Sequence, residues 1–152
     1  MKKVLLGCGT SILVVLVVFA LFVCYIVNLF SDNLSKKQIF SLVNKNHELL
    51  NVCIDSNDFS EIKQLKGVKE VTFENGVLDI YCGGSGFGSA TNYYGFYYSP
   101  SNKPLVVWCG HISENNSLLP DGKGYSLKNP NDDNWYYTER IRENFFYYES
   151  HF

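Results

Sequence analysis

The residues of this sequence that could do chemistry are a few thiols and imidazoles. Cys109 and His111 stand two apart, so both side chains would lie on one face of an extended strand, as a cysteine nucleophile and its base do. That spacing is common, and the sequence offers no third residue to orient the imidazole. Zinc is also disfavoured, because His47, His111 and His151 are not paired with cysteines at a ligand spacing. We therefore expect no catalytic residue, no metal site and no cofactor.

A glycine-rich segment, residues 82–90, is the strongest candidate for contact with a ligand. Gly84 and Gly86 alternate with other residues, but the dinucleotide motif requires a glycine where Ser89 stands, and no Gly-Lys-Ser/Thr follows. We interpret the segment as a loop or bulge whose backbone amides could hold an anionic or sugar ligand. The candidate ligand-facing residues are Gly84, Gly86, Tyr94 and Tyr97.

Aromatic residues are concentrated in the second half of the chain. Seventeen of the 72 residues from Tyr81 to Phe152 are Phe, Trp or Tyr, and several are adjacent, as in Tyr93–Tyr94 and Tyr147–Tyr148. Neighbours on a strand point to opposite faces, so one ring of each pair can enter the core while the other is left for solvent, the membrane surface or a partner. Exposed rings suit sugar stacking, peptide capture or a protein interface. A tyrosine-rich sheet with ordinary cross-strand pairs explains the same pattern.

The cysteines of the second part of the chain allow one disulfide. Cys82 and Cys109 each end a predicted strand, so they are candidates for neighbours across a sheet and for a disulfide outside the cytoplasm. Cys53 is more simply a buried helix residue. The interpretation that all three are ordinary small apolar residues is slightly favoured.

The N-terminal segment is predicted to be a membrane anchor. No charged residue occurs from Val4 to Phe30, and a helix of that length spans about 40 Å, more than a hydrocarbon core of about 30 Å. The apolar run is longer than that of a signal peptide and has no cleavage site, so we expect an uncleaved signal anchor. Lys2 and Lys3 precede it, which favours a cytoplasmic N-terminus and a domain outside the plasma membrane.

The remaining pattern predicts an anchor over 1–30, a hinge over 31–34 and one α+β domain over 35–152 with a mostly antiparallel sheet. A capping box at Ser35 and Gln38 starts a helix, and Asn75-Gly76 is the signature of a hairpin tip. The predicted helices are 36–52 and 59–65; the strands are 68–73, 77–81, 93–99, 105–109 and 135–137; 111–134 is a long loop, and 139–149 fits a strand or a helix.

The C-terminal run of aromatic residues is predicted to dock as a final strand or helix, with Phe145 or Phe146 in the core, because a disordered tail would be poor in aromatics. Charge argues against nucleic acid as a partner. Without Lys2 and Lys3 the chain holds 11 basic and 15 acidic residues, whereas nucleic-acid binding requires a basic face.

Four stretches carry a resemblance to known proteins: Tyr81–Gly86, Tyr93–Pro100, Asp133–Glu139 and Asn144–Phe152. Together they resemble a family of small uncharacterised membrane-anchored proteins of Gram-positive bacteria, over about 35–152. The resemblance implies a bacterial envelope protein and supplies no catalytic residue.

The leading hypothesis is a membrane-tethered, non-enzymatic binding or structural module of the bacterial cell envelope, with a protein or glycan partner. The alternatives are an envelope enzyme or glycan-binding domain that uses the glycine segment and its aromatics, and a membrane-bound immunity or accessory protein. An enzyme should show a concave pocket with two titratable groups in contact, and a binder an aromatic patch without one.

Overall fold

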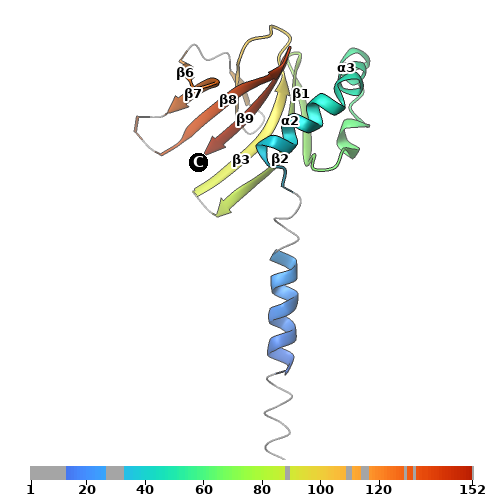
Figure 1. The fold of residues 1–152 in the computed structure, drawn as a ribbon, viewed down its shortest axis with the longest axis vertical. Coiled ribbons are helices and arrows are strands. Elements are labelled where there is room, and N and C mark those ends of the chain that lie inside the picture. Colours follow the sequence, from blue (N-terminus) through green and yellow to red (C-terminus); the bar gives the residue numbers. More distant parts are fainter. Residues whose placement is uncertain are drawn as a thin grey trace, which may run out of the picture. The chain divides into compact units, whose positions relative to one another are not determined.

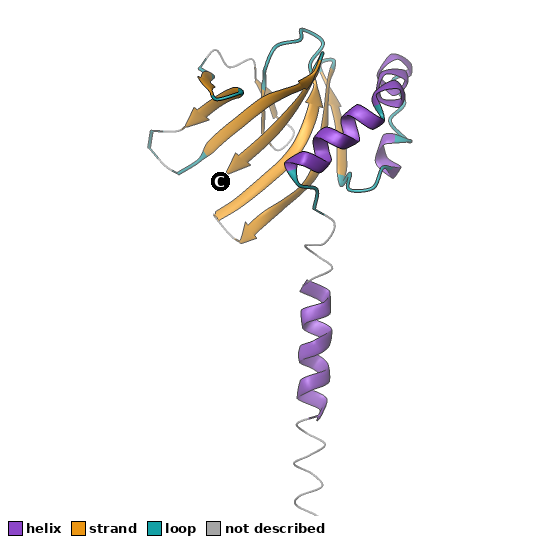
Figure 2. Ribbon diagram, viewed as in Figure 1, coloured by secondary structure: helices purple, strands orange, loops and turns teal. Residues whose placement is uncertain are grey.

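The computed structural model describes residues 13–26, 33–87, 90–108, 111–113, 117–128, 130–131 and 133–151. The chain forms two compact units, Met1–Asp32 and Asn33–Phe152. In the first unit residues 13–26 are helical (Figure 2), and the rest of the predicted anchor, 4–12 and 27–30, lies outside the described residues. Within the described ranges, no helix combines the length and the apolar character needed to cross a membrane.

The second unit combines two α-helices and a 3-10 turn with a large antiparallel sheet (Figure 1). The helices are α2 (Lys36–Lys45), α3 (His47–Ser56) and η1 (Ile62–Gln64). The strands are β1 (Glu70–Glu74), β2 (Val77–Phe87), β3 (Ala90–Tyr98), β4 (Val106–Trp108), β5 (His111–Ser113), β6 (Leu119–Asp121), β7 (Gly124–Lys128), β8 (Trp135–Arg142) and β9 (Phe145–His151).

The strand order places the last strand of the domain near the middle of the sheet. In the described part of the chain, seven strands form one sheet in the order β1-β2-β3-β9-β8-β7-β6, and β4 pairs with β5 separately. All these neighbours are antiparallel. The predicted α+β class with an antiparallel sheet is therefore confirmed.

The predicted single helix 36–52 is wrong, because the chain bends at Asn46. This residue has φ −108° and ψ 19°, outside helical values, and separates α2 from α3. Its side-chain amide donates to the Leu42 carbonyl at 2.8 Å, so the first helix ends on a local hydrogen bond. The capping box at the start of α2 is confirmed, since the Ser35 amide donates to Gln38 Oε1 at 2.9 Å. The short helix expected over 59–65 is the narrower turn η1.

The start of the domain contacts the sheet directly. The Asn33 side-chain amide donates to the Gly84 carbonyl, and the Leu34 amide donates to the Cys82 carbonyl at 3.5 Å. Both residues belong to the hinge predicted from the sequence. In the structure their hydrogen bonds hold the segment before α2 against the middle of β2.

The hairpin expected at Asn75-Gly76 is confirmed. Glu74 lies opposite Val77, and the two residues between them have positive φ, 52° for Asn75 and 79° for Gly76. These angles are those of a type I′ turn, whose twist matches that of the strands it joins.

We expect Gly76→Val to destabilise the domain by about 1–3 kcal/mol, because a β-branched residue is strained at positive φ. A Cβ at this position would meet only Pro100 Cγ, at 3.8 Å, so strain and not a clash would be the cause. Denaturant melting of residues 33–152 measures the effect. Gly76→Asn is the matched control and should cost much less, because Asn tolerates positive φ. Equal melting of the Val and Asn variants would contradict this interpretation.

The glycine-rich segment 82–90, interpreted as a loop or a bulge, is strand over its described residues 82–87 and 90, so the loop is wrong, whereas the register shift between Tyr81 and Gly83 bears out the bulge. In this outer part of a long hairpin Gly84 lies opposite Tyr93 and Gly86 opposite Thr91. A Cβ on Gly86 would fall 1.9 Å from the Ala90 carbonyl oxygen. The glycine is therefore required for the close approach of two strands, which a sequence pattern alone does not separate from a flexible loop.

The polar stretch 111–134, expected to be a loop, contains the short strands β5, β6 and β7. β6 is exposed throughout and lies at one edge of the sheet, so it lacks the apolar alternation by which strands are recognised. The ambiguous stretch 139–149 is a β-hairpin that turns at Asn144, which has φ 62°.

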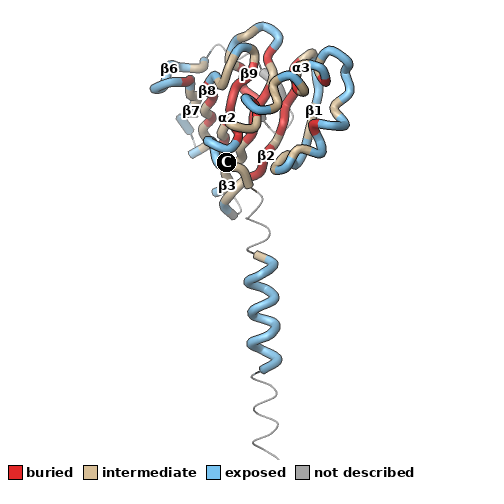
Figure 3. The backbone as a smooth tube through the Cα atoms, turned by 45° about the vertical axis from the view of Figure 1, so that its right-hand side comes forward, coloured by how far each residue is buried: buried red, intermediate tan, exposed pale blue. Residues whose placement is uncertain are grey.

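The sheet buries side chains on both of its faces, in two separate clusters. The red segments of β2 and β9 in Figure 3 mark buried residues of these strands. On one face the helices cover a cluster that includes Ile80, Phe96 and Tyr147. On the other face the segment around β4 covers a second cluster, which contains Val77, Tyr97, Leu105, Val106, Val107, Tyr136, Phe146 and Tyr148. Both rings of the Tyr147–Tyr148 pair are therefore buried, whereas the sequence pattern predicted one ring inside and one outside. The prediction that Phe145 or Phe146 is core is confirmed, since both are 1% exposed.

Candidate functional site

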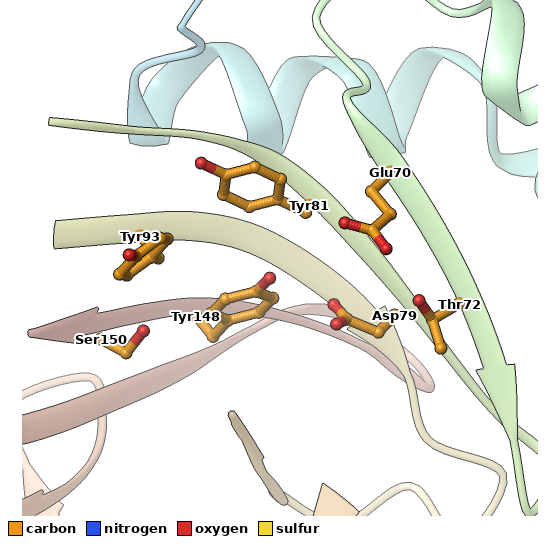
Figure 4. Close-up of a pocket in the computed structure, with 7 residues that line it drawn as sticks. All are labelled: Glu70, Thr72, Asp79, Tyr81, Tyr93, Tyr148 and Ser150. Carbon is orange, nitrogen blue, oxygen red and sulfur yellow. The ribbon is translucent and has the colours of Figure 1, made fainter. Parts of the chain in front are cut away.

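A small pocket lies on the face of the sheet opposite the helices, where β1, β2, β3 and β9 run side by side (Figure 4). Its volume is about 190 Å³. Its lining residues are Glu70 and Thr72 on β1, Asp79 and Tyr81 on β2, Tyr93 on β3, and Tyr148 and Ser150 on β9.

Strand alternation and register bring these side chains together. Residues two apart on a strand share a face, so Asp79 and Tyr81 point away from the helices, while Ile80 between them points toward them. Glu70 lies opposite Tyr81 and Thr72 opposite Asp79 in the β1–β2 pairing. Tyr93 lies opposite Ser150 in the β3–β9 pairing, which completes the pocket from the other side.

Gly95 on β3 allows one ring to cross the sheet. It lies between Tyr81 and Tyr148 in the register. A Cβ at Gly95 would fall 2.6 Å from carbons of the Tyr148 ring, so only glycine leaves room for that ring over β3. Figure 4 shows the Tyr148 ring directed along the sheet toward Asp79. Its hydroxyl donates a hydrogen bond to the Asp79 carboxyl group.

Asp79 is the most unusual polar residue of the domain, with 6% of its surface exposed. Its Oδ1 atom is buried and has no hydrogen-bond partner among the described residues. Burial raises the pKa of Asp79 to about 7, the Tyr148 hydrogen bond opposes that rise, and the Glu70 carboxylate adds to it. Near neutral pH the pocket therefore holds a carboxyl group that is only partly ionised and partly satisfied.

The pocket is acidic and walled by aromatic rings. Two carboxyl groups line it, and none of its described lining residues is basic. The rings of Tyr81 and Tyr93 have centroids 6.0 Å apart at 48°, and Tyr148 supplies a third ring. Such a site attracts a positive charge through both the carboxylates and the faces of the rings. The described residues include no cluster of three His, Cys, Asp or Glu side chains that could hold a metal ion.

Asp79 and Tyr148 are two titratable groups in contact within a concave pocket, which is the arrangement that we expected of an enzyme. Burial raises the pKa of Tyr148 well above its ordinary value, so its hydroxyl keeps its proton and acts as a hydrogen-bond donor. This leaves Asp79 as the pocket residue whose pKa is shifted to about 7.

The residues that the sequence suggested as ligand-facing are not brought together. Tyr97 is fully buried, and its hydroxyl lies 2.9 Å from Thr138 Oγ1 and accepts a hydrogen bond from the Leu105 amide at 2.8 Å, so that prediction is wrong. Tyr94 packs beside the cluster under the helices and contacts Ser85 Oγ at 2.8 Å through its hydroxyl, on the face opposite the pocket. Gly84 and Gly86 lie in paired strands, where ladder hydrogen bonds engage the backbone.

The disulfide between Cys82 and Cys109 was predicted on the premise that both residues end strands, and for Cys82 this premise is wrong. Cys82 does not end a strand but lies inside β2, where the register shifts between Tyr81 and Gly83, and its thiol is buried and free. The strand before Cys109, β4, belongs to the other sheet, and Cys109 lies outside the described residues. Cys53 is buried in α3 as expected.

Sequence reasoning missed the pocket, although one signal was available. Asp79 interrupts the apolar run Val77-Leu78-Asp79-Ile80 in the middle of a predicted strand. A carboxylate is costly to bury, so its presence there indicates a functional group more often than an accident. The sequence does not reveal which residues contact Asp79, because Tyr148 is distant from it along the chain.

Comparison with protein-family models, with curated proteins and with solved structures finds no match for this chain.

Proposed function

We propose that this chain is a single-pass, membrane-anchored binding module of the bacterial cell envelope, and that its domain outside the membrane binds the positively charged group of an organic ligand in the Asp79 pocket. The anchor is supported by the first unit. Apolar side chains surround its helix on every side, with Leu13, Phe19 and Leu21 all more than 60% exposed. A helix that is apolar all round belongs in a protein core or in a bilayer.

The observation that carries the binding proposal is the unpartnered Oδ1 atom of Asp79. A buried polar group without a hydrogen bond costs free energy, so natural proteins supply a partner for nearly all of them. In this pocket a cation would provide the partner, since the surrounding groups are a second carboxylate, hydroxyls and tyrosine rings. The cost of keeping Asp79 buried is therefore offset when ligand is bound.

The size of the pocket limits what enters it. At about 190 Å³ it is smaller than sites for whole drug-sized molecules, which are roughly 300–1,000 Å³. It accommodates one charged group of a larger ligand, such as a side chain of a protein partner or an amino group of a glycan.

An envelope enzyme is the second candidate, and the pKa of Asp79 favours it. A carboxyl group with a pKa of about 7 is suited to general acid or base catalysis near neutral pH. Recovery of bound ligand in unchanged form separates the two functions, because an enzyme would convert it.

Calorimetric titration of full-length protein, extracted from the membrane fraction into detergent, tests the proposal. We expect n-butylammonium to bind and its neutral analogue 1-butanol to bind at least tenfold more weakly. The Asp79→Asn variant should no longer bind n-butylammonium. Asp121→Asn is the matched control, since Asp121 is an exposed carboxylate outside the pocket, and it should bind as the parent does. Equal binding of amine and alcohol, or full binding by Asp79→Asn, would exclude a cation site at Asp79.

A further inference from the structure

We propose that the ligand group in the Asp79 pocket is a primary ammonium on an unbranched alkyl chain, as in a lysine side chain or a linear diamine. This inference rests on the proposed function and specifies the ligand of the same site. It excludes quaternary ammonium groups, which aromatic pockets otherwise bind well.

The first reason is the need for a hydrogen-bond donor. Tyr148 already donates to the Asp79 carboxyl group, and the remaining oxygen, Oδ1, is buried without a partner. A quaternary ammonium has no N–H group and would leave this oxygen unsatisfied. A primary ammonium has three N–H donors and forms charge-assisted hydrogen bonds with carboxylates.

The second reason is the distribution of polar and aromatic groups along the pocket. Figure 4 shows the side chains of Glu70, Thr72 and Asp79 gathered at one end, while Tyr81, Tyr93 and the small Ser150 lie toward the other end. Three oxygen-bearing side chains at one end match the three donors of an ammonium group. The rings at the other end suit a slim apolar chain that carries it.

The third reason is that the domain already holds a primary ammonium in this way elsewhere. On the helix-covered face, Lys36 Nζ forms an ion pair with the Glu139 carboxylate. The same nitrogen lies 4.8 Å from the ring centroid of Tyr137 and 5.2 Å from that of Tyr147. A carboxylate framed by tyrosine rings therefore binds a lysine-type ammonium in this fold, and the Asp79 pocket presents the same chemistry without an internal lysine among its lining residues.

A guanidinium group fits less well. Its planar fork binds best when both oxygens of a carboxylate are free. One oxygen of Asp79 is occupied by Tyr148, so the remaining one favours a compact point charge.

The test is calorimetric titration of the full-length chain in detergent with n-butylammonium, n-butyltrimethylammonium and n-butylguanidinium at pH 8. We expect the primary ammonium to bind at least tenfold more tightly than either of the others. If the trimethyl compound or the guanidinium binds as tightly, this inference is overturned while a cation site remains. If none of the three binds, the proposed function fails as well.

A variant and two further probes complete the experiment. Thr72→Val keeps the shape of the side chain and removes a hydroxyl from the acidic end of the pocket. It should therefore weaken the binding of n-butylammonium several-fold and leave the affinity for the trimethyl compound unchanged. Thr91→Val, outside the pocket lining, is the control. Tighter binding of Nα-acetyl-lysine amide than of cadaverine identifies a protein as the source of the group, and the reverse order identifies a free diamine. Failure of both probes overturns the inference.

Discussion

Deletion of Phe145–Phe152 should abolish cooperative folding of the domain. These residues include β9, which pairs with β3 on one side and with β8 on the other, so its loss divides the sheet. Four of its rings are buried, Phe145, Phe146 and Tyr147 at 1% exposure and Tyr148 at 5%. Burial of a large apolar side chain stabilises by about 1.5–3 kcal/mol, so four rings represent roughly 6–12 kcal/mol against a typical stability of 5–15 kcal/mol.

Circular dichroism during denaturant melting compares residues 33–152 with residues 33–144 and measures this effect. A single substitution separates ring burial from loss of backbone pairing. Phe146→Ala should cost about 3–5 kcal/mol, whereas Phe73→Ala, a control on β1 where the ring is 40% exposed, should cost much less. A truncated domain that melts at the same denaturant concentration as its parent would show that the tail is not part of the core.

Asp79→Asn should stabilise the domain at pH 8 while it removes binding of the cation. The pKa of Asp79 is raised from its ordinary 3.8 to about 7, mainly because burial disfavours the charged form. Between these values the folded state holds a proton that the unfolded state has released. The contribution of Asp79 to stability is therefore most favourable below about pH 4, falls as the pH rises toward 7, and is level above it. Each unit of pKa shift corresponds to about 1.4 kcal/mol, so the cost at pH 8 is on the order of 4 kcal/mol.

The measurement is the free energy of unfolding of the parent and of Asp79→Asn from pH 4 to pH 8. The parent should lose stability over this range relative to the variant, and their difference should be largest at pH 8. Glu149→Gln is an informative control, because burial also raises the pKa of Glu149 but this carboxyl group lies outside the pocket. A difference between parent and Asp79→Asn that does not vary with pH would mean that Asp79 titrates normally.

Local features of the fold were predictable from the sequence, and the pocket was not. Asn75-Gly76 specifies its turn through two backbone angles, and Ser35 with Gln38 specifies a helix start within four residues. The interruption at Asn46 was missed because the apolar spacing continues through it into α3.

The pocket depends on a register that joins distant segments. Glu70 and Ser150 line one pocket only because β9 returns to the middle of the sheet beside β3. Nothing in the periodicity of any one strand specifies that neighbour, and the same alternation would fit an edge position. The role of Gly95 was also not predictable from the sequence. It depends on the Tyr148 ring, which lies over this glycine only in the folded sheet.

The central place of β9 has a consequence for the order of events during synthesis. β3 has β2 on one side, and on the other its backbone has no partner until Phe145–His151 has been made. The half of the domain that holds α2, α3 and β1 to β3 therefore cannot complete its core until β9 has been synthesised. The two halves of the domain thus fold together and not one after the other along the growing chain.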